Sequence, residues 1–435
     1  MKLVGFLSRN IRSIPKELSS KFPSSIFLVL FLTLQLILTF NLFTVFRYFS
    51  LDVGDWWLVS PPHDLWCDPS KGEGIGLHCF GDYSLTTMIA SESNPWNNSI
   101  VGSFNYPAGG LLIFKVLSSL ELVVGIQNFG LFTYLFLTII SIALPALLLS
   151  NQISIDQRIL FAVGSISSLP ALLIIDRGNS VGIAFAFLFL FIYFYKKGKI
   201  SQSILFLVIS SLLKPQFAIF LLFLVFNRKW KQFYISSCAI GVSQVASFLA
   251  WPNAFPNTLE QAFRGVLSYS NNWELTNLEI PNYSIGRGFI GIATMFGIDF
   301  SNQVQGIVVL LLFLLTVAIF LLFKQISTLT HLVFLGTAAS FAVNVSWGYY
   351  AIIPILYIYV LVQSEFDERT KSSLLSKSLV AIASALTLSR FIVVIPSSGE
   401  WEVIDNTTTI GLMWLILSIL MVIFDWNKSR NRQEV

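Results

Sequence analysis

A few acidic, basic and amide side chains stand at breaks in an otherwise apolar chain, and these side chains could do chemistry. Asp82 opens the polar stretch GDYSLTTMIASESNPWNNSIVGSFNYPAGG, which covers residues 81–110. The sequence DRGN at residues 176–179 and the sequence KP at residues 214–215 stand between later apolar segments. A carboxylate can take the proton of an attacking hydroxyl group, and a lysine or arginine can neutralise a phosphate group. Such chemistry requires that the fold bring these breaks together.

The composition is that of a chain whose solvent is mostly lipid. Of its 435 residues, 55% are hydrophobic and 11% are charged, and the mean hydropathy is +0.73. A soluble domain carries about 25% charged residues. The net charge of +4 is small, and we expect no nucleic acid as a partner. With three cysteines and three histidines, neither a disulfide scaffold nor a Cys/His metal site is expected, so we predict no metal and no cofactor.

The first apolar segment, residues 25–47, is long enough to cross a membrane as a helix. Five basic residues precede it, which predicts a cytoplasmic N-terminus: Lys2, Arg9, Arg12, Lys16 and Lys21. Residues 49–107 then form a polar loop on the outer side. Residues 108–120 are too short to span and are interrupted by Lys115, so we expect a helix that lies in the membrane interface.

Further spans are predicted at residues 129–150, 158–175, 180–195, 233–251, 303–323, 328–345, 349–363, 378–395 and 409–425. The apolar stretch 201–226 carries a Lys-Pro step at its centre, and basic residues at both ends favour a hairpin of two short helices over one long helix. About twelve crossings result, with both termini in the cytoplasm. We therefore predict an all-α, multi-pass protein of the plasma membrane. Residues 1–435 form a single domain with two outer loops, residues 49–128, which carry interfacial helices, and residues 252–302.

This topology gathers ionisable side chains on the outer side, where charges at the membrane boundary tend to mark pathways or sites. They are Asp52, Asp55, His63, Asp64, Asp68, His78, Asp82, Glu92, Asp176, Arg177, Lys214 and Arg287. Simpler interpretations stay open. Loop charges are often merely solvated, Asp176 and Arg177 could form an ion pair that structures their turn, and Lys214 could extend toward the lipid headgroups. The functional interpretation of Lys214 is a cation that binds a phosphate group.

Other kinds of chemistry have no support in the sequence. It contains no Gly-x-Ser-x-Gly elbow, no Walker loop and no GxGxxG motif after a strand. The three histidines do not lie near a convincing nucleophile, and we assign His331 no role. Cys67 and Cys79 could form one disulfide in the first outer loop or remain two free thiols.

Four stretches, taken in order, are similar to motifs of one family of membrane enzymes. They are residues 81–110 with their acidic residue, Asn-Pro-Trp turn and Tyr-Pro step; DRGN at 176–179; LKPQ at 213–216 with RKW at 228–230; and NYSI at 282–285 with Arg287, followed by SWGYY at 346–350. Over residues 80–365 the chain resembles the bacterial alpha-1,2-mannosyltransferase-like family of the C-type glycosyltransferase superfamily. The four motifs occur in the order in which the family carries them.

The resemblance implies the C-type glycosyltransferase fold and a reaction. The enzyme would move a hexose, with mannose expected, from a polyprenyl-phosphate-sugar donor to a lipid-linked or envelope glycan acceptor at the outer face, with inversion at the sugar carbon. Asp82 is then the candidate base, and Lys214, Arg287 and Arg177 are candidate ligands of the donor phosphate. Six residues are candidates for positioning the sugar or the acceptor: Asp176, Asn179, Asn282, Tyr106, Trp347 and Tyr349.

The chain departs from the family pattern in three places. Residues 49–80 look like an insertion before the acidic residue, so Asp52 or Asp55 could be the base instead of Asp82. Tyr-Pro-Ala replaces the commoner Tyr-Pro-Pro, and Tyr349 and Tyr350 stand where relatives often carry histidine. A lipid-linked polysaccharide polymerase and a glycolipid transporter or flippase are the alternative functions. A transporter needs polar groups that run toward both faces, whereas here they gather on one side.

Overall fold

The computed structural model describes residue 33 and the ranges 80–97, 106–126, 128–149, 153–272, 282–300, 303–343, 346, 348–363, 373–389, 392–397, 400–405 and 407–433. Several sequence-based expectations lie outside these residues: the first span at 25–47, the insertion at 49–80 except Phe80, Asp52, Asp55, the pair Cys67 and Cys79, and Trp347.

Helices make up nearly all the regular structure of the described residues, as the sequence predicts. The first half of the chain contains α5 (Gly81–Ser91), η2 (Pro95–Asn97), α6 (Ala108–Val124), α7 (Phe129–Leu147), α8 (Ile155–Ile166), α9 (Leu169–Arg177), α10 (Val181–Lys196), α11 (Ile200–Leu213), η3 (Pro215–Phe220), α12 (Leu221–Phe226) and α13 (Trp230–Ser247). Helix α10 lies at the centre of this half, and α7, α9 and α11 pack against it. It is apolar on all sides and buried along most of its length.

The second half forms a group of helices beside the first. It contains η4 (Phe248–Ala250), η5 (Pro252–Ala254), α14 (Asn257–Asn272), α15 (Ile285–Met295), α16 (Val304–Leu321), α17 (Thr328–Phe341), η6 (Gly348–Ile352), α18 (Pro354–Val362), α19 (Leu374–Leu388) and α20 (Thr407–Gln433). Helix α20 packs against α15 and α17. Its Asp425 carboxylate accepts hydrogen bonds from the backbone N–H of Ser327 (2.9 Å) and the hydroxyl of Thr330 (2.6 Å), and so caps the start of α17.

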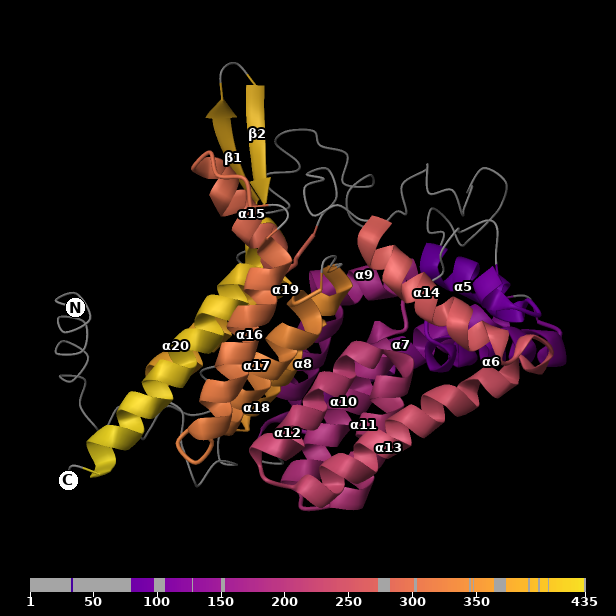
Figure 1. Cartoon of the computed structure of the whole chain (residues 1–435), viewed down its shortest axis with the longest axis horizontal. Helices are drawn as coiled ribbons and strands as arrows, with labels where there is room; N and C mark the ends of the chain where they lie inside the picture. Colours follow the sequence, from indigo (N-terminus) through magenta and orange to yellow (C-terminus); the bar gives the residue numbers. More distant parts are fainter. Residues whose placement is uncertain are drawn as a thin grey trace.

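One hairpin interrupts the helical pattern. Strands β1 (Ile392–Ser397) and β2 (Glu400–Asp405) pair antiparallel, with Ile392 opposite Asp405. The sequence predicts a span at residues 378–395, but α19 ends at Leu388. The run Ile-Val-Val-Ile at residues 392–395 is β-branched and prefers an extended backbone. The apolar signal that suggested a longer helix therefore belongs partly to a strand, which projects from the end of the bundle (Figure 1).

Several helices are long and apolar enough to cross a membrane, which indicates a membrane protein. Among the described residues they are Phe129–Leu147, Trp230–Ala250, Val304–Leu321 and Thr409–Asn431, with a fifth if the bent pair Ile155–Ile166 and Leu169–Arg177 is one span. Seven further apolar segments are shorter, 10–17 residues each. The outward sides of α7, α13 and α16 expose large apolar side chains, including Phe136, Val242 and Phe313, as expected of surfaces that meet lipid.

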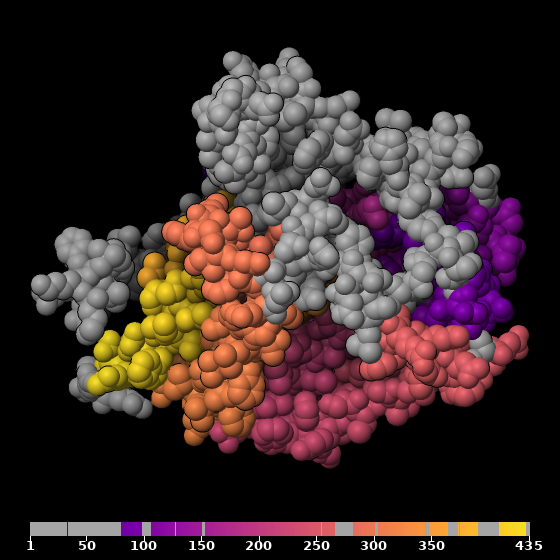
Figure 2. Space-filling view, turned by 45° about the horizontal axis from the view of Figure 1, so that its top comes forward, coloured from indigo at the N-terminus to yellow at the C-terminus, as the bar shows by residue number. Residues whose placement is uncertain are grey.

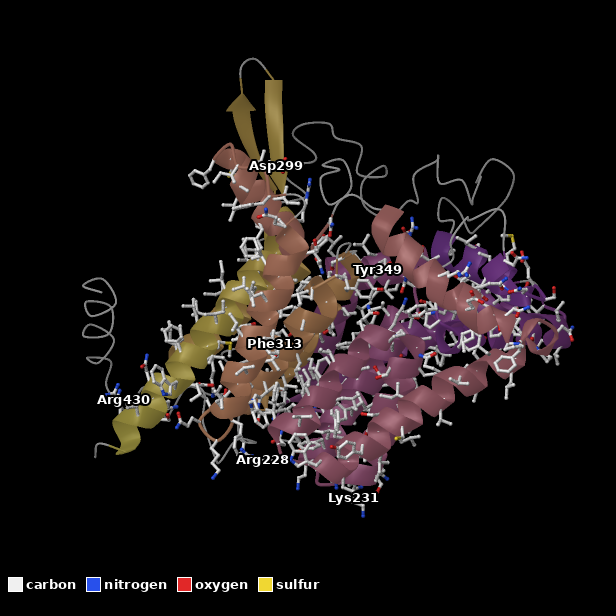
Figure 3. All side chains as sticks on the ribbon, in the orientation of Figure 1. Arg228, Lys231, Asp299, Phe313, Tyr349 and Arg430 are labelled. Atoms are coloured by element: carbon white, nitrogen blue, oxygen red, sulfur yellow. The ribbon has the colours of Figure 1, made fainter. Side chains whose placement is uncertain are left out.

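The two ends of the bundle differ in chemistry. Arg228, Lys231 and Arg430 lie at one end, which we call the basic end, and Asp299 and Tyr349 lie toward the other (Figure 3). Helices α5, α9, α14 and α15 and the hairpin also lie toward that other end, which we call the loop end (Figure 1). The space-filling view shows a recess between α16 (orange) and α13–α14 (salmon), with magenta residues from the middle of the chain at its floor (Figure 2).

Candidate functional site

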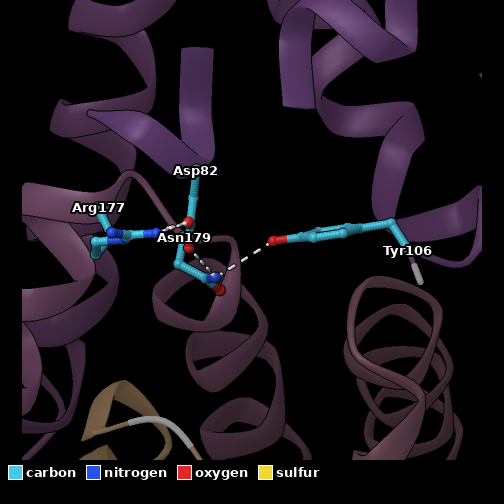
Figure 4. A network of polar contacts seen from close by, with 4 residues as sticks. All are labelled: Asp82, Tyr106, Arg177 and Asn179. Atoms are coloured by element: carbon cyan, nitrogen blue, oxygen red, sulfur yellow. Dashed lines mark hydrogen bonds and ion pairs between the residues drawn. The ribbon is translucent and has the colours of Figure 1, made fainter. Parts of the chain in front are cut away.

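Asp82 lies in the first turn of α5 and accepts hydrogen bonds at both carboxylate oxygens (Figure 4). Arg177 donates to Oδ1 from Nη2 (2.8 Å) and from Nε (3.2 Å). Asn179 donates from Nδ2 to Oδ2 (2.7 Å). The side chain of Asp82 is 18% exposed and that of Arg177 is 32% exposed, so the ion pair lies at the edge of the solvent-accessible surface. The acid and the DRGN turn, 95 residues apart in sequence, form one unit.

The glycine of the DRGN turn allows α5 and α9 to meet. Gly178 ends α9 with a left-handed backbone (φ 72°), and a Cβ atom there would stand 2.4 Å from Cβ of Tyr83. Asn179 is buried, and its Oδ1 accepts a hydrogen bond from the N–H of Val181 at the start of α10 (3.1 Å). The hydroxyl of Tyr134 donates to the carbonyl oxygen of Asn179. The turn thus presents the amide nitrogen of Asn179 toward Asp82 in a fixed position.

Tyr106 and Lys214 extend the cluster. Nδ2 of Asn179 also donates to the hydroxyl of Tyr106 (3.2 Å). Nζ of Lys214 lies 4.4 Å from the centre of the Tyr106 ring and 6.0 Å from that of Tyr350. Lys214 is only 6% exposed, yet no acceptor or carboxylate among the described residues pairs with its ammonium group. Burial of a charge in this way is costly unless a counter-ion binds.

A helix break places Lys214 in this position. Pro215 has no N–H, so it cannot bond the carbonyl of Ser211 one turn earlier, and α11 ends at Leu213, as the sequence predicts. Gln244 of α13 replaces the lost bond, because its Nε2 donates to the carbonyl oxygens of Ser211 (3.2 Å) and Leu212 (3.1 Å). The backbone at the break is therefore satisfied from another helix, and the lysine side chain is left beside Tyr106.

Aromatic side chains hold the loop that carries Tyr106. The indole N–H of Trp96 donates to the carbonyl of Tyr106 (2.9 Å), and the Trp96 ring packs edge-on to that of Trp251 (5.3 Å). Lys115 of α6 donates to the carbonyl of Ala250 (2.7 Å) and lies over the Trp251 ring (4.5 Å). Partial burial lowers the pKa of Lys115. Trp96 thus has a structural role, as a buried support of the site.

Tyr83 ties α5 to the neighbouring helices and shows how closely this end of the molecule is packed. Its ring lies between those of Phe114 and Tyr134, at 5.9 Å and 5.3 Å. Burial, and secondarily the negative charge of Glu121, raises the pKa of the Tyr83 hydroxyl far above its usual value. Tyr83 therefore stays neutral and supports Asp82, the residue before it, by packing.

A second group joins the later motifs. Oδ1 of Asn282 accepts hydrogen bonds from the N–H groups of Ser284 (3.0 Å) and Ser346 (2.9 Å), and the N–H of Tyr283 donates to the carbonyl of Ser346 (2.9 Å). The hydroxyl of Ser284 caps α15 by accepting from the N–H of Arg287 (3.1 Å). Arg287 is 1% exposed, and burial lowers its pKa. These bonds bring together two segments 64 residues apart in sequence.

Helix η6 connects the second group to the first. Gly348 lies so close to the Tyr283 ring that a Cβ atom would stand 3.1 Å from it. Tyr349 and Tyr350 follow, with ring centres 4.8 Å apart, and Tyr350 is the neighbour of Lys214 described above. Tyr350 of η6 therefore connects the second group to Lys214 of the first group.

The structure brings five of the sequence-predicted residues into one connected cluster: Asp82, Tyr106, Arg177, Asn179 and Lys214. Asp176 is buried in the last turn of α9. Asn282, Arg287 and Tyr349 belong to the second group. The ion pair that structures the DRGN turn joins Arg177 to Asp82. Gln244 and the support by Trp96 were not predicted. The only sequence signal for Gln244 is indirect: Pro215 leaves a carbonyl that some donor must satisfy.

Among the described residues, no group of three or more His, Cys, Asp or Glu side chains could hold a metal ion. Comparison with known proteins adds no assignment: no protein-family model matches the chain, and neither curated proteins nor solved structures contain a match.

Proposed function

We propose that the protein is a membrane glycosyltransferase that moves a hexose, expected to be mannose, from a polyprenyl-phosphate-sugar donor to a lipid-linked or envelope glycan. One observation carries the proposal. The ammonium group of Lys214 is buried beside two tyrosine rings, and no described residue forms an ion pair or a hydrogen bond with it; the charge of Asp82 acts on it only from beyond contact distance. The phosphate of a lipid donor would supply the missing negative charge, and its apolar chain suits a site in a membrane protein.

The reaction needs a base on the same cluster. The acceptor oxygen attacks the anomeric carbon, and the bond from that carbon to the phosphate oxygen breaks. The phosphate leaves with the electron pair, and Asp82 takes the proton of the acceptor hydroxyl. A single displacement of this kind inverts the anomeric centre. Oδ2 of Asp82 accepts one hydrogen bond from the described residues, so it keeps a lone pair for that proton.

Arg177 and Asn179 orient the base. Arg177 donates twice to Oδ1 and so leaves Oδ2 as the oxygen available to the acceptor. Tyr106 connects the surroundings of Asp82 to Lys214. Its hydroxyl accepts a hydrogen bond from Asn179, and the ammonium group of Lys214 lies over its ring. Lys214 is the first cation for the donor phosphate, with Arg177 and Arg287 as further cations. We assign positioning of the sugar and acceptor to Asp176, Asn179, Asn282, Tyr106, Trp347 and Tyr349.

The proposal includes an arrangement in the membrane. We place the loop end outside the cell and the basic end in the cytoplasm, following the positive-inside rule, with about twelve crossings in a C-type glycosyltransferase fold. Both termini are then cytoplasmic. The recess between α16 and α13–α14 would let a lipid-linked donor approach from the side (Figure 2).

Transfer of radiolabel tests this function. Purified protein in lipid nanodiscs is given labelled polyprenyl-phosphate-mannose and a glycolipid extract, and a parallel sample receives labelled GDP-mannose as the control donor. We expect label in the glycolipid from the polyprenyl donor alone. Absence of transfer from that donor, or equal transfer from the nucleotide sugar, would contradict the proposal. A polymerase would instead join preassembled lipid-linked oligosaccharides and leave the single labelled sugar untouched.

A further inference from the structure

A group of exposed cations lies at the basic end, whereas α5 and α9, which carry Asp82 and Arg177, lie toward the loop end (Figures 1 and 3). Arg228 and Lys229 stand between α12 and α13, Lys231 lies in the first turn of α13, and Lys324 follows α16. All four side chains are exposed. None of them forms an ion pair with a residue that the structure describes. Four positive charges thus share one small surface without compensation from the described part of the chain.

Aromatic rings hold this surface in shape. The guanidinium carbon of Arg228 lies 4.1 Å from the centre of the Phe323 ring and 5.6 Å from that of Phe320. Nζ of Lys324 lies 5.9 Å from the same Phe323 ring. The Trp230 ring lies 6.5 Å from that of Phe320. A guanidinium group stacked on a ring keeps its N–H donors at the edge, where they can meet an anion.

The backbone conformation of Arg228 is a further observation that favours a specific role for its side chain at this surface. Its φ is 54°, in the left-handed region that a side chain makes unfavourable. Glycine would take this turn at lower cost, and the equivalent turn after α10 does use glycine, Gly198 at φ 72°. The chain carries an arginine here in spite of the backbone cost, and its side chain lies over the two phenylalanine rings.

Apolar helix faces continue from these cations toward the middle of the bundle. Helix α16 exposes Phe313, Leu314, Val317 and Leu321, and α13 exposes Tyr234 and Ile235. Both helices are long and apolar enough to cross a membrane. A lipid whose headgroup meets the cations could therefore lay its acyl chains along α13 and α16.

We propose that this surface, Arg228, Lys229, Lys231 and Lys324, binds the headgroup of an anionic phospholipid. Charge complementarity favours an anionic lipid over a zwitterionic one. A zwitterionic headgroup carries its own ammonium group, whereas an anionic headgroup brings the net negative charge that four uncompensated cations attract. The positive-inside rule alone requires only basic residues near the span ends. The stacked rings and the arginine at a left-handed turn are additional features that a fixed headgroup site explains. This inference is independent of the glycosyltransferase proposal.

Native mass spectrometry of the purified full-length protein tests the site. Phosphatidylglycerol and phosphatidylcholine with identical acyl chains are titrated in separate samples. The test variant is Arg228→Gln with Lys324→Gln, and the matched control is Lys197→Gln with Lys199→Gln. The control removes two exposed cations that also lie over aromatic rings, at the turn after α10. Because each basic residue contributes about 1 kcal/mol to binding an anionic lipid surface, we expect phosphatidylglycerol to bind the test variant about 30-fold more weakly.

The control variant should keep the affinity of the unaltered protein within about threefold, and phosphatidylcholine should bind more weakly than phosphatidylglycerol to the unaltered protein. Equal binding of the two lipids would overturn the proposal, as would equal losses in both variants, which would indicate general charge attraction. Glycerol phosphate should not compete at lipid-like concentrations, and competition would show a soluble-phosphate site instead. If the double variant does not fold, Lys324→Gln alone is used, with an expected loss of about fivefold.

Discussion

Asp82 and Lys214 are the charged residues of the cluster to which we assign the base and the first phosphate ligand, and their surroundings differ in kind. Asp82 is held by three hydrogen bonds from Arg177 and Asn179, while Lys214 is buried with aromatic rings as its described neighbours. A carboxylate held in one orientation suits proton transfer. A desolvated cation that no carboxylate of the described residues contacts suits the capture of a phosphate group. The division of roles in the proposed reaction follows from this difference.

Substitution of Asp82 by Asn tests the role of the base. Asn keeps the shape of the side chain but cannot take the acceptor proton, so we expect the transfer rate to fall by about 100- to 10,000-fold. Binding of the donor and the melting temperature should change little, because the ion pair with Arg177 is partly exposed. The measurement is single-turnover transfer of radiolabel at saturating donor.

The matched control is Asp156→Asn, since Asp156 lies in the first turn of α8 and is exposed. This variant should retain full activity. A transfer rate of Asp82→Asn close to that of the control would exclude Asp82 as the base. Asp52 or Asp55 would then be the next candidates.

At the level of elements, two breaks position the cluster. The Gly178 turn allows α5 to pack on the end of α9, and the Lys-Pro step ends α11 beside Tyr106. Both breaks were predictable, because glycine and proline have strong local preferences. Their partners were not predictable, since Gln244 bonds Ser211 and Leu212 across about 30 residues and no local pattern marks it. The β1–β2 hairpin was missed because a β-branched run looks like the end of an apolar helix.

Gly178→Ala tests how tightly the first break is packed. The new Cβ would meet Tyr83, and alanine also disfavours the left-handed backbone, so we expect the free energy of unfolding to fall by about 2–4 kcal/mol. Gly198→Ala is the control, because Gly198 has the same φ of 72° but open space around its Cβ. It should cost about 1–2 kcal/mol, the backbone cost alone.

Urea unfolding of both variants, monitored by tryptophan fluorescence, measures the difference. Transfer activity should fall in Gly178→Ala at temperatures where the protein is still folded, because Asp82 moves with Tyr83. If the two alanine variants are equally stable and equally active, α5 does not depend on the close approach at the turn.

For the whole molecule, the proposed orientation rests on the separation of a basic end from a loop end (Figures 1 and 3). Hydropathy and charge patterns predicted a chain made mostly of apolar helices with basic residues gathered at one end, because both signals act along the chain; the number of crossings and the orientation stay predictions. They could not predict that Asp82, Tyr106, Asn179 and Lys214 meet, since packing between distant elements decides those contacts. The resemblance supplied candidates, and the fold brings five of them into one cluster.

Cysteine labelling tests the orientation. In a chain whose native cysteines, Cys67, Cys79 and Cys238, are replaced by serine, Lys231→Cys and Asn253→Cys place single thiols just inside and just beyond the two ends of the span Trp230–Ala250. Both positions are exposed. An impermeant maleimide should label Asn253→Cys in intact cells and Lys231→Cys only after permeabilisation. The reverse pattern would put the cluster on the cytoplasmic side.

Binding of polyprenyl phosphate to Lys214→Met tests the central claim most directly. Methionine removes the buried charge and keeps much of the volume, so the free protein should gain about 1–3 kcal/mol of stability or remain unchanged. We predict that polyprenyl phosphate raises the melting temperature of the unaltered protein and binds Lys214→Met at least about tenfold more weakly, since a hydrogen bond to a charged group contributes about 1.5–3 kcal/mol. Equal affinity of the two proteins for polyprenyl phosphate would contradict the account, because Lys214 would then not be the cation that holds the donor.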